Sequence, residues 1–239
     1  MTNRFLMKAV ILAGGYGTRM SEETHLKPKP MIEIGEKPIL WHIMKIYSHY
    51  GINEFVICCG YKAKIIQEYA KTLDESWTVT PVDTGINTMT GGRLKLVKKY
   101  VENETFCFTY GDTLNNVKID ELVNFHFDKK VIATITACKP PEKYGLLKIE
   151  NEKVVDFQEK PHIEGEWVNG GFFVLNPQVF DYIKNDSTVW EKEPMEKLTK
   201  DGQLSAYEHR GFYQPMDTIS DKNHLEKLWQ NNEALWKVW

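Results

Sequence analysis

The stretch Lys8 to Arg19, which reads KAVILAGGYGTR, decides the fold. Its first six residues form a compact apolar run, which is typical of a parallel strand buried on both faces. Gly14 and Gly15 follow at once, and Gly17 comes two residues later. Glycines here let backbone N–H groups approach a ligand closely, and such a nest binds anions. The stretch therefore predicts an α/β fold whose first strand ends at an anion-binding loop.

The chain up to about residue 137 alternates between helical and strand patterns. The connections between these segments are short, which favours a mostly parallel, Rossmann-like sheet flanked by helices. The spacing of apolar residues, with Gly or Pro at the ends of segments, predicts strands over 54–59, 106–110 and 131–137, and helices over 38–50, 64–71 and 119–127.

The remaining chain departs from this alternation. Two short alternating runs, 144–150 and 153–159, predict a hairpin, that is, a small β-rich insertion on the substrate side. A strand over 171–175 and a helical C-terminal part from about Asn223 complete the expected elements. We expect one domain over 1–239, with 7–135 mainly binding nucleotide and 136–239 mainly binding the acceptor.

Composition excludes several classes of protein. The 239 residues carry 30 basic and 33 acidic side chains, which leaves no basic excess to neutralise a nucleic-acid backbone. No apolar run approaches the roughly 20 residues of a membrane span. The four cysteines lack CxxC spacing, and free thiols fit a reducing cytoplasm. The sequence predicts a cytoplasmic protein without a nucleic-acid or membrane partner.

Two further groups add positive charge near the glycines. Thr18 and Arg19 offer a hydroxyl and a guanidinium fork suited to phosphate oxygens. Lys27 and Lys29 lie in a proline-stiffened KPKP segment, which indicates a cation held against a polyphosphate, although a solvated basic loop is the alternative. A dinucleotide fingerprint does not fit, because Met20 stands where its last glycine would be.

Asp112 is the candidate metal ligand. It follows the apolar strand over 106–110, at the strand end where open α/β sheets place their ligands. Magnesium usually takes one or two protein carboxylates together with phosphate oxygens, and Asp217 is the partner we expect. A plain turn is the alternative, since Gly-Asp after a strand also makes one.

These motifs carry a family resemblance over nearly the whole chain from Met7. The chain resembles the sugar-phosphate nucleotidyltransferases, which join a nucleoside monophosphate unit to a sugar 1-phosphate and release pyrophosphate. Finer motifs resemble the branch that uses CTP and glucose 1-phosphate to make surface polysaccharide precursors. The motifs are LAGGYGTRM (12–20), KPKPMIEIG (27–35), KPILWHIM (37–44), ICCGYK (57–62), MTGGRL (89–94), TYGD (109–112), QEKP (158–161), NGGFFVLNP (169–177) and QPMDT (214–218).

The resemblance implies a role for each matching residue. Arg19, Lys29 and Asp112 would be catalytic, Asp112 and Asp217 would bind Mg²⁺, and Gly91 would contact the base. The triphosphate would be wrapped by Leu12, Ala13, Gly14, Gly15, Gly17, Thr18 and Arg19. The acceptor would be held by Tyr144, Gly145, Glu159, Lys160 and Asn169.

The stretch between Tyr69 and Asp83 is shorter than this branch carries. The acceptor therefore stays open between a sugar 1-phosphate, such as glucose 1-phosphate, and a phosphorylated amino acid, phosphoglutamine, which similar sequences use in capsule modification. The alternative to an enzyme is a regulatory module that binds nucleotide without catalysing a reaction. The expected partners are CTP and the phosphorylated small molecule, and a homo-oligomer is left open.

Overall fold

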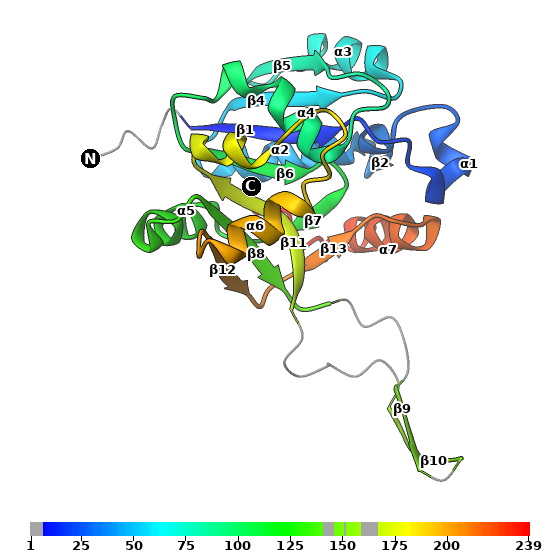
Figure 1. The fold of residues 1–239 in the computed structure, drawn as a ribbon. Helices are drawn as coiled ribbons and strands as arrows, with labels where there is room; N and C mark the ends of the chain where they lie inside the picture. The colour runs from blue at the N-terminus through cyan, green and yellow to red at the C-terminus, as the bar shows by residue number, and fades with distance from the viewer. Residues whose placement is uncertain (1–6, 141–145, 151, 159–166) are drawn as a thin grey trace.

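A seven-stranded sheet organises the chain, as Figure 1 shows. The computed structural model describes residues 7–140, 146–150, 152–158 and 167–239. The first strand, β1 (Lys8–Ala13), lies between β6 (Phe106–Tyr110) and β4 (Glu54–Cys59) and is parallel to both. The full order is β12-β8-β11-β6-β1-β4-β5. The apolar run that opens the sequence is thus an interior strand, as its composition predicts.

The outer strands complete a mostly parallel sheet. Within the described sheet, the strand that runs against the others is β11, which pairs antiparallel with both β6 and β8. This confirms the predicted fold class. The bounds are β5 (Thr78–Asp83), β8 (Ala133–Cys138), β11 (Val168–Leu175) and β12 (Leu204–His209).

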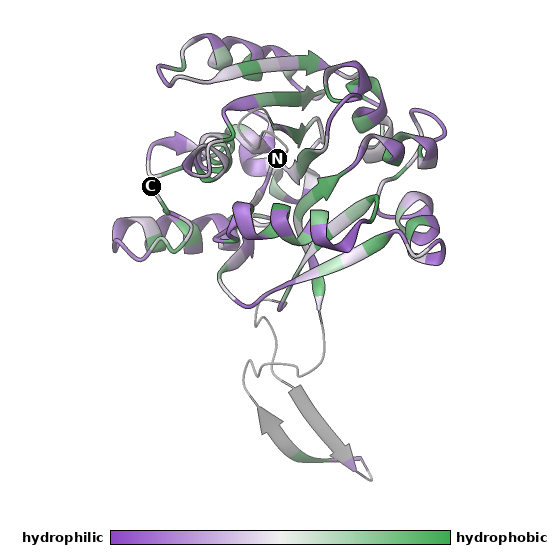
Figure 2. Ribbon diagram, turned by 90° about the vertical axis from the view of Figure 1, so that its left-hand side faces the viewer, coloured by the Kyte–Doolittle hydropathy of each residue, from purple (hydrophilic) through white to green (hydrophobic). Residues whose placement is uncertain are grey.

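Helices cover both faces of this sheet, and the side chains of β1 alternate between two apolar cores. Ile11 packs into the core beneath one set of helices, and Val10 and Leu12 pack into the core beneath the other. Figure 2 shows the hydrophobic colour concentrated in the central strands. The first set is α2 (Ile39–His49), α3 (Ala63–Lys71), α5 (Ile119–Lys129) and α7 (Ile219–Gln230), and the second is α4 (Thr90–Leu96), the 3₁₀ segment η5 (Pro177–Tyr182) and α6 (Glu193–Lys200).

The predicted hairpin is present. It consists of β9 (Leu146–Glu150) and β10 (Lys153–Gln158), which pair antiparallel with each other and with no other described strand. The predicted C-terminal helix has different bounds. It begins at Ile219, because Thr218 and Asp221 form a capping box, and it ends at Gln230. Trp236, expected on the helix, instead packs buried beyond its end.

Several short elements lie between the longer helices and strands. They are η2 (Thr18–Met20), α1 (Ser21–Thr24), η3 (Lys29–Met31), β2 (Glu33–Ile34), β3 (Lys37–Pro38), η4 (Lys98–Tyr100), β7 (Thr113–Asn115) and β13 (Tyr213–Pro215).

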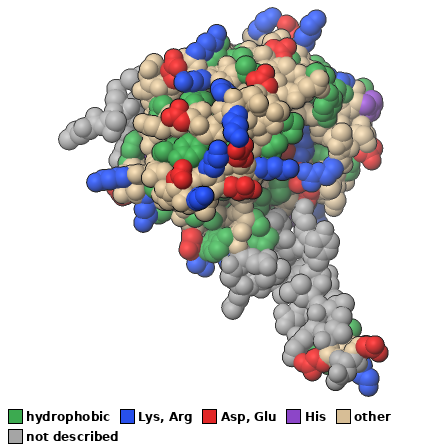
Figure 3. All heavy atoms as spheres, viewed as in Figure 1, with side chains coloured by type: hydrophobic (Ala, Val, Ile, Leu, Met, Phe, Trp, Pro, Cys, Tyr) green, Lys and Arg blue, Asp and Glu red, His purple; other side chains and the backbone are tan. Residues whose placement is uncertain are grey.

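No helix in the described part of the chain is long and apolar enough to cross a membrane. On the face drawn in Figure 3, acidic and basic side chains are interspersed over the described surface.

A buried histidine, His42 on α2, is neutral in the folded protein at pH 7. Trp236 donates its Nε1–H to His42 Nδ1 at 3.3 Å, so Nε2 carries the proton and donates to the Ile34 carbonyl at 2.8 Å. Burial lowers the pKa of His42 from 6.5 to about 4, while Glu226 raises it and Lys237 lowers it. Protonating Nδ1 would place two N–H groups against each other, so the fold excludes the charged ring.

The stability of the fold is therefore expected to fall in acid. The contribution of His42 is fully present above pH 6.5 and is lost as the pH falls towards about 4, because in that window only the unfolded chain binds the proton. We expect a loss of about 3 kcal/mol, measured by urea unfolding at several pH values. The His42→Gln variant should show a shallower slope with pH, and an unchanged slope would contradict this account.

Candidate active site

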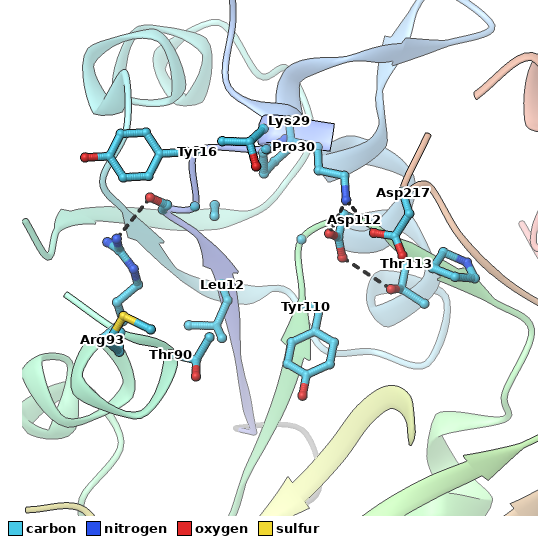
Figure 4. A pocket seen from close by; sticks show the side chains of 18 of the residues that line it. Leu12, Tyr16, Lys29, Pro30, Thr90, Arg93, Tyr110, Asp112, Thr113 and Asp217 are labelled. Atoms are coloured by element: carbon cyan, nitrogen blue, oxygen red, sulfur yellow. Dashed lines mark hydrogen bonds and ion pairs between the residues drawn. The ribbon is translucent and has the colours of Figure 1, made fainter. Parts of the chain in front are cut away.

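A cleft of about 800 Å³ opens at the carboxyl ends of β1 and β6. In open α/β sheets this edge is where ligands bind. The cleft is lined by the glycine loop after β1, by residues 86–90, by the end of β6, and by residues from β11 and β13. Figure 4 shows side chains of residues that line it. Segments far apart in the sequence therefore meet at one edge of the sheet.

The glycine loop presents free backbone donors to the cleft. Within the described residues, the N–H groups of Gly15, Tyr16 and Gly17 donate to no protein acceptor. Gly17 has a left-handed backbone with φ of 63°, and a Cβ there would lie 2.8 Å from Thr24 Cγ2. Only glycine adopts this conformation without strain. The loop has the form of an anion nest.

A buried arginine, Arg93 on α4, holds the loop from behind. Its guanidinium donates to the carbonyls of Gly14 at 3.0 Å, Cys59 at 3.1 Å and Gly85 at 2.7 Å. It also donates to Thr84 Oγ1 at 2.8 Å. A Cβ on Gly14 would lie 2.1 Å from the guanidinium, so Gly14 has to be glycine for Arg93 to reach this position. One side chain thus joins the ends of β1 and β4 to the loop after β5.

Lys29 forms the centre of charge in the cleft. Its Nζ lies 2.7 Å from Asp112 Oδ2 and 2.9 Å from Asp217 Oδ1, as Figure 4 shows. The side chain of Lys29 is only 11% exposed. Burial lowers the pKa of Lys29, but the two carboxylates outweigh burial, so the net pKa lies above its ordinary value. Lys29 is therefore charged, and Arg19 adds a second cation 3.0 Å from Asp217 Oδ1.

Two short strands bring Asp112 and Asp217 together. β7 pairs antiparallel with β13, and Met216 N–H donates to the Asp112 carbonyl at 2.8 Å. Asp217 also lies at the start of α7, where Asp221 accepts from its backbone N–H at 3.0 Å. The N-terminal end of a helix favours an anion. Residues more than 100 positions apart thereby share one edge of the cleft.

A group of polar side chains, called here the polar wall, lines the same cleft as these carboxylates. Asn169 Nδ2 donates to the Tyr110 hydroxyl at 2.9 Å, and Asn169 O accepts from the Tyr213 hydroxyl at 3.2 Å. Burial raises the pKa of Tyr110 well above its ordinary value, so its hydroxyl keeps its proton. Glu191 accepts from Thr90 Oγ1 at 2.7 Å. This wall offers hydroxyl, amide and carboxylate groups to a bound ligand.

Comparison with known proteins gives the family. The family model described as nucleotidyl transferase matches residues 8–235. The chain belongs to the nucleotidyl transferase family. The matched range includes the glycine loop, Lys29, both carboxylates and the polar wall.

Two curated relatives of this nucleotidyltransferase align over nearly its whole length. Glucose-1-phosphate cytidylyltransferase of Salmonella typhi is 52% identical over 256 residues, which covers 98% of this chain and all of the relative. The probable glucose-1-phosphate cytidylyltransferase of Bacillus subtilis is 44% identical, with the same coverage. The first alignment is longer than the 239 residues of this chain, so the relative carries residues without a counterpart here.

Solved structures share the fold of this nucleotidyltransferase. HddC from Yersinia pseudotuberculosis, complexed with GMP-PN, superposes with a TM-score of 0.75 and covers 94% of this chain and 100% of that chain. Its sequence is 24% identical, so this likeness shows the fold alone. HddC and this chain thus share one overall fold.

Most of the predicted site residues converge on the cleft. Gly91 does not line it but packs against Thr188, while its neighbours Met89 and Thr90 do line it. Tyr144, Gly145, Glu159 and Lys160 lie outside the described residues. The predicted residues that line the cleft are Leu12, Ala13, Gly14, Gly15, Gly17, Thr18, Arg19, Lys29, Asp112, Asn169 and Asp217.

Arg93, Tyr110 and Glu191 are among the cleft residues that the sequence analysis did not single out. Arg93 and Tyr110 stand inside the motifs MTGGRL and TYGD, so the motifs themselves offered a signal for them. Glu191 stands in an irregular segment before α6, and no pattern in the sequence marks it. It lines the cleft and accepts a hydrogen bond from Thr90, 101 positions away in the chain.

Proposed function

We propose that this protein is a magnesium-dependent cytidylyltransferase that joins CMP from CTP to glucose 1-phosphate and releases pyrophosphate. The convergence of Arg19, Lys29, Asp112 and Asp217 on the glycine loop is the observation that carries the proposal. The 52% identity to a glucose-1-phosphate cytidylyltransferase supports the choice of both substrates. Surface polysaccharide precursor synthesis is the process to which we assign it.

The residues present fit a magnesium ion. Asp112 and Asp217 face each other at the cleft edge with a positive charge already between them. Magnesium takes one or two carboxylates and completes its shell with substrate phosphates and water. Asp112 and Asp217 would hold it, and when bound it would neutralise charge on the triphosphate.

The chain's own residues position two anions for reaction. The N–H groups of Gly15 to Gly17 bind the triphosphate, with Thr18 alongside, and Lys29 and Arg19 offset negative charge at the α-phosphorus. A phosphate oxygen of the acceptor forms the new bond to the α-phosphorus, and the bond to the β-phosphate oxygen breaks. Since the nucleophile is already an anion, no general base is needed. Catalysis is then positioning plus electrostatics.

We place the acceptor along the polar wall made by Asn169, Tyr110 and Tyr213, and we keep Tyr144, Gly145, Glu159 and Lys160 as acceptor contacts on the family resemblance alone. In this assignment the nucleotide lies mainly on the 7–135 part of a single domain, and the acceptor mainly on the 136–239 part.

The four cysteines are all buried and free, which supports a cytoplasmic location.

Phosphoglutamine is the second candidate acceptor. Only six residues separate α3, which ends at Lys71, from β5, which begins at Thr78. A relative that uses glucose 1-phosphate carries additional residues over the aligned length. A catalytically silent nucleotide-binding module is disfavoured, because all four charged groups of the site are present and converge.

A panel of phosphorylated acceptors tests this function. Purified protein with CTP and Mg²⁺ is incubated with glucose 1-phosphate or with phosphoglutamine, and pyrophosphate release is measured. We expect release with glucose 1-phosphate well above the rate without acceptor, and less with UTP in place of CTP. Pyrophosphate release with phosphoglutamine but not with glucose 1-phosphate would identify phosphoglutamine as the acceptor. CTP binding without pyrophosphate release for any acceptor would favour the catalytically silent module.

A further inference from the structure

We infer that the ammonium group of Lys29 takes the place of the divalent cation in the nucleotide-free protein, so that metal binds strongly only together with the nucleotide. The inference rests on the proposed function, in that it takes Asp112 and Asp217 as the metal ligands. It adds an order of events to that function. Lys29 first neutralises the carboxylates and then moves its charge to the triphosphate.

The contacts of Lys29 are those of a stand-in cation. Its Nζ bridges one oxygen of Asp112 and one oxygen of Asp217, at 2.7 and 2.9 Å. A metal ion held by the same oxygens would compete for the same lone pairs. It would also lie next to a buried positive charge, and like charges at such short range repel. Metal binding therefore requires Lys29 to leave.

The charges of Lys29, Arg19, Asp112 and Asp217 already balance. Asp217 Oδ1 forms ion pairs with Lys29 Nζ at 2.9 Å and with Arg19 Nη2 at 3.0 Å. Asp112 Oδ2 forms an ion pair with Lys29 Nζ. Two carboxylates thus face two cations. A divalent ion that entered alone would leave the cluster with an excess of positive charge. A triphosphate that entered with the ion would supply more than enough negative charge to hold all the cations.

Lys29 can change partners without moving its backbone. Pro28 and Pro30 are buried on either side of it, which fixes its main chain. Its stem runs along the glycine loop, since a Cβ on Gly17 would lie 3.2 Å from Lys29 Cβ and 3.7 Å from Lys29 Cδ. A rotation of its last side-chain torsions moves the ammonium from the carboxylates towards an anion in the nest of Gly15 to Gly17.

Binding of Mn²⁺ in the absence of nucleotide tests this inference. Free Mn²⁺ is measured by electron paramagnetic resonance during titration of the wild type, Lys29→Met and Lys27→Met. We expect Lys29→Met to bind Mn²⁺ at least about tenfold more tightly than the wild type, since a neighbouring charge typically shifts an ion equilibrium by one to three powers of ten. Lys27, in the same segment, pairs with Glu33 at 2.8 Å, and its variant should match the wild type.

Two measurements secure the result. Adding Asp112→Asn to Lys29→Met should abolish the tight Mn²⁺ site. If Lys29→Met unfolds easily without metal, its melting temperature should rise with Mn²⁺ more than that of the wild type. Equal Mn²⁺ affinity of the wild type and Lys29→Met, or equal tightening in Lys27→Met, would overturn the inference. Because no acceptor or turnover is involved, failure of the proposed reaction would be seen separately.

Discussion

Replacing Lys29 by methionine is expected to lower kcat for pyrophosphate release by about 100- to 1000-fold, the loss typical for removal of one preorganised electrostatic group. Methionine keeps most of the length and apolar stem of lysine, so the buried environment changes little apart from the charge. The charge is what the reaction needs, because two anions have to approach each other at the α-phosphorus. Steady-state kinetics with CTP and the acceptor measure the effect.

Lys27 provides the matched control for this prediction. It lies two residues away, pairs with Glu33 and does not line the cleft. We expect Lys27→Met to keep kcat within a factor of about two, because exposed ion pairs contribute little. Retention of most activity by Lys29→Met would show that the charge at residue 29 is not part of the chemistry.

Replacing Arg93 by methionine is expected to destabilise the fold by about 2–4 kcal/mol, because several buried acceptors lose their donor at once. The affected acceptors are the carbonyls of Gly14, Cys59 and Gly85 and the hydroxyl of Thr84. Urea unfolding measures the loss. Since Gly14 opens the glycine loop, the KM for CTP should also rise.

Arg210 is the control for Arg93. It is an exposed arginine whose ion partner is Glu208 at 3.0 Å. We expect Arg210→Met to change the free energy of unfolding by less than about 0.5 kcal/mol. If Arg93→Met and Arg210→Met were equally stable, the hydrogen bonds of Arg93 would not hold the loops together.

The interior of the sheet could be predicted from sequence, and its edges could not. The run over Lys8–Ala13 and the strands Glu54–Cys59 and Phe106–Tyr110 are buried on both faces, so their apolar runs are continuous. β5 and β12 lie at the two edges, with mostly half-buried or exposed residues, and leave no such run. The C-terminal helix was misplaced because its start depends on the capping pair Thr218 and Asp221.

Some residues of the cleft could likewise be predicted from the sequence, and others could not. The glycines, Lys29 and Asp112 could be found because their types and spacing fit phosphate and metal chemistry. Asp217 was chosen as a partner, but its distance from Lys29 depends on the pairing of β7 with β13, which are three residues each. The role of Arg93 could not be predicted, because its acceptors include backbone carbonyls of three segments that are far apart in the sequence.

Transfer of label from CTP carrying ³²P at the α-phosphate tests the central claim most directly. The protein is incubated with this CTP, Mg²⁺ and glucose 1-phosphate, and the products are separated. We predict that label appears in a sugar nucleotide while the pyrophosphate stays unlabelled, and that the double variant Asp112→Asn with Asp217→Asn transfers almost none. Absence of transfer by the wild type, or full transfer by the double variant, would contradict the account.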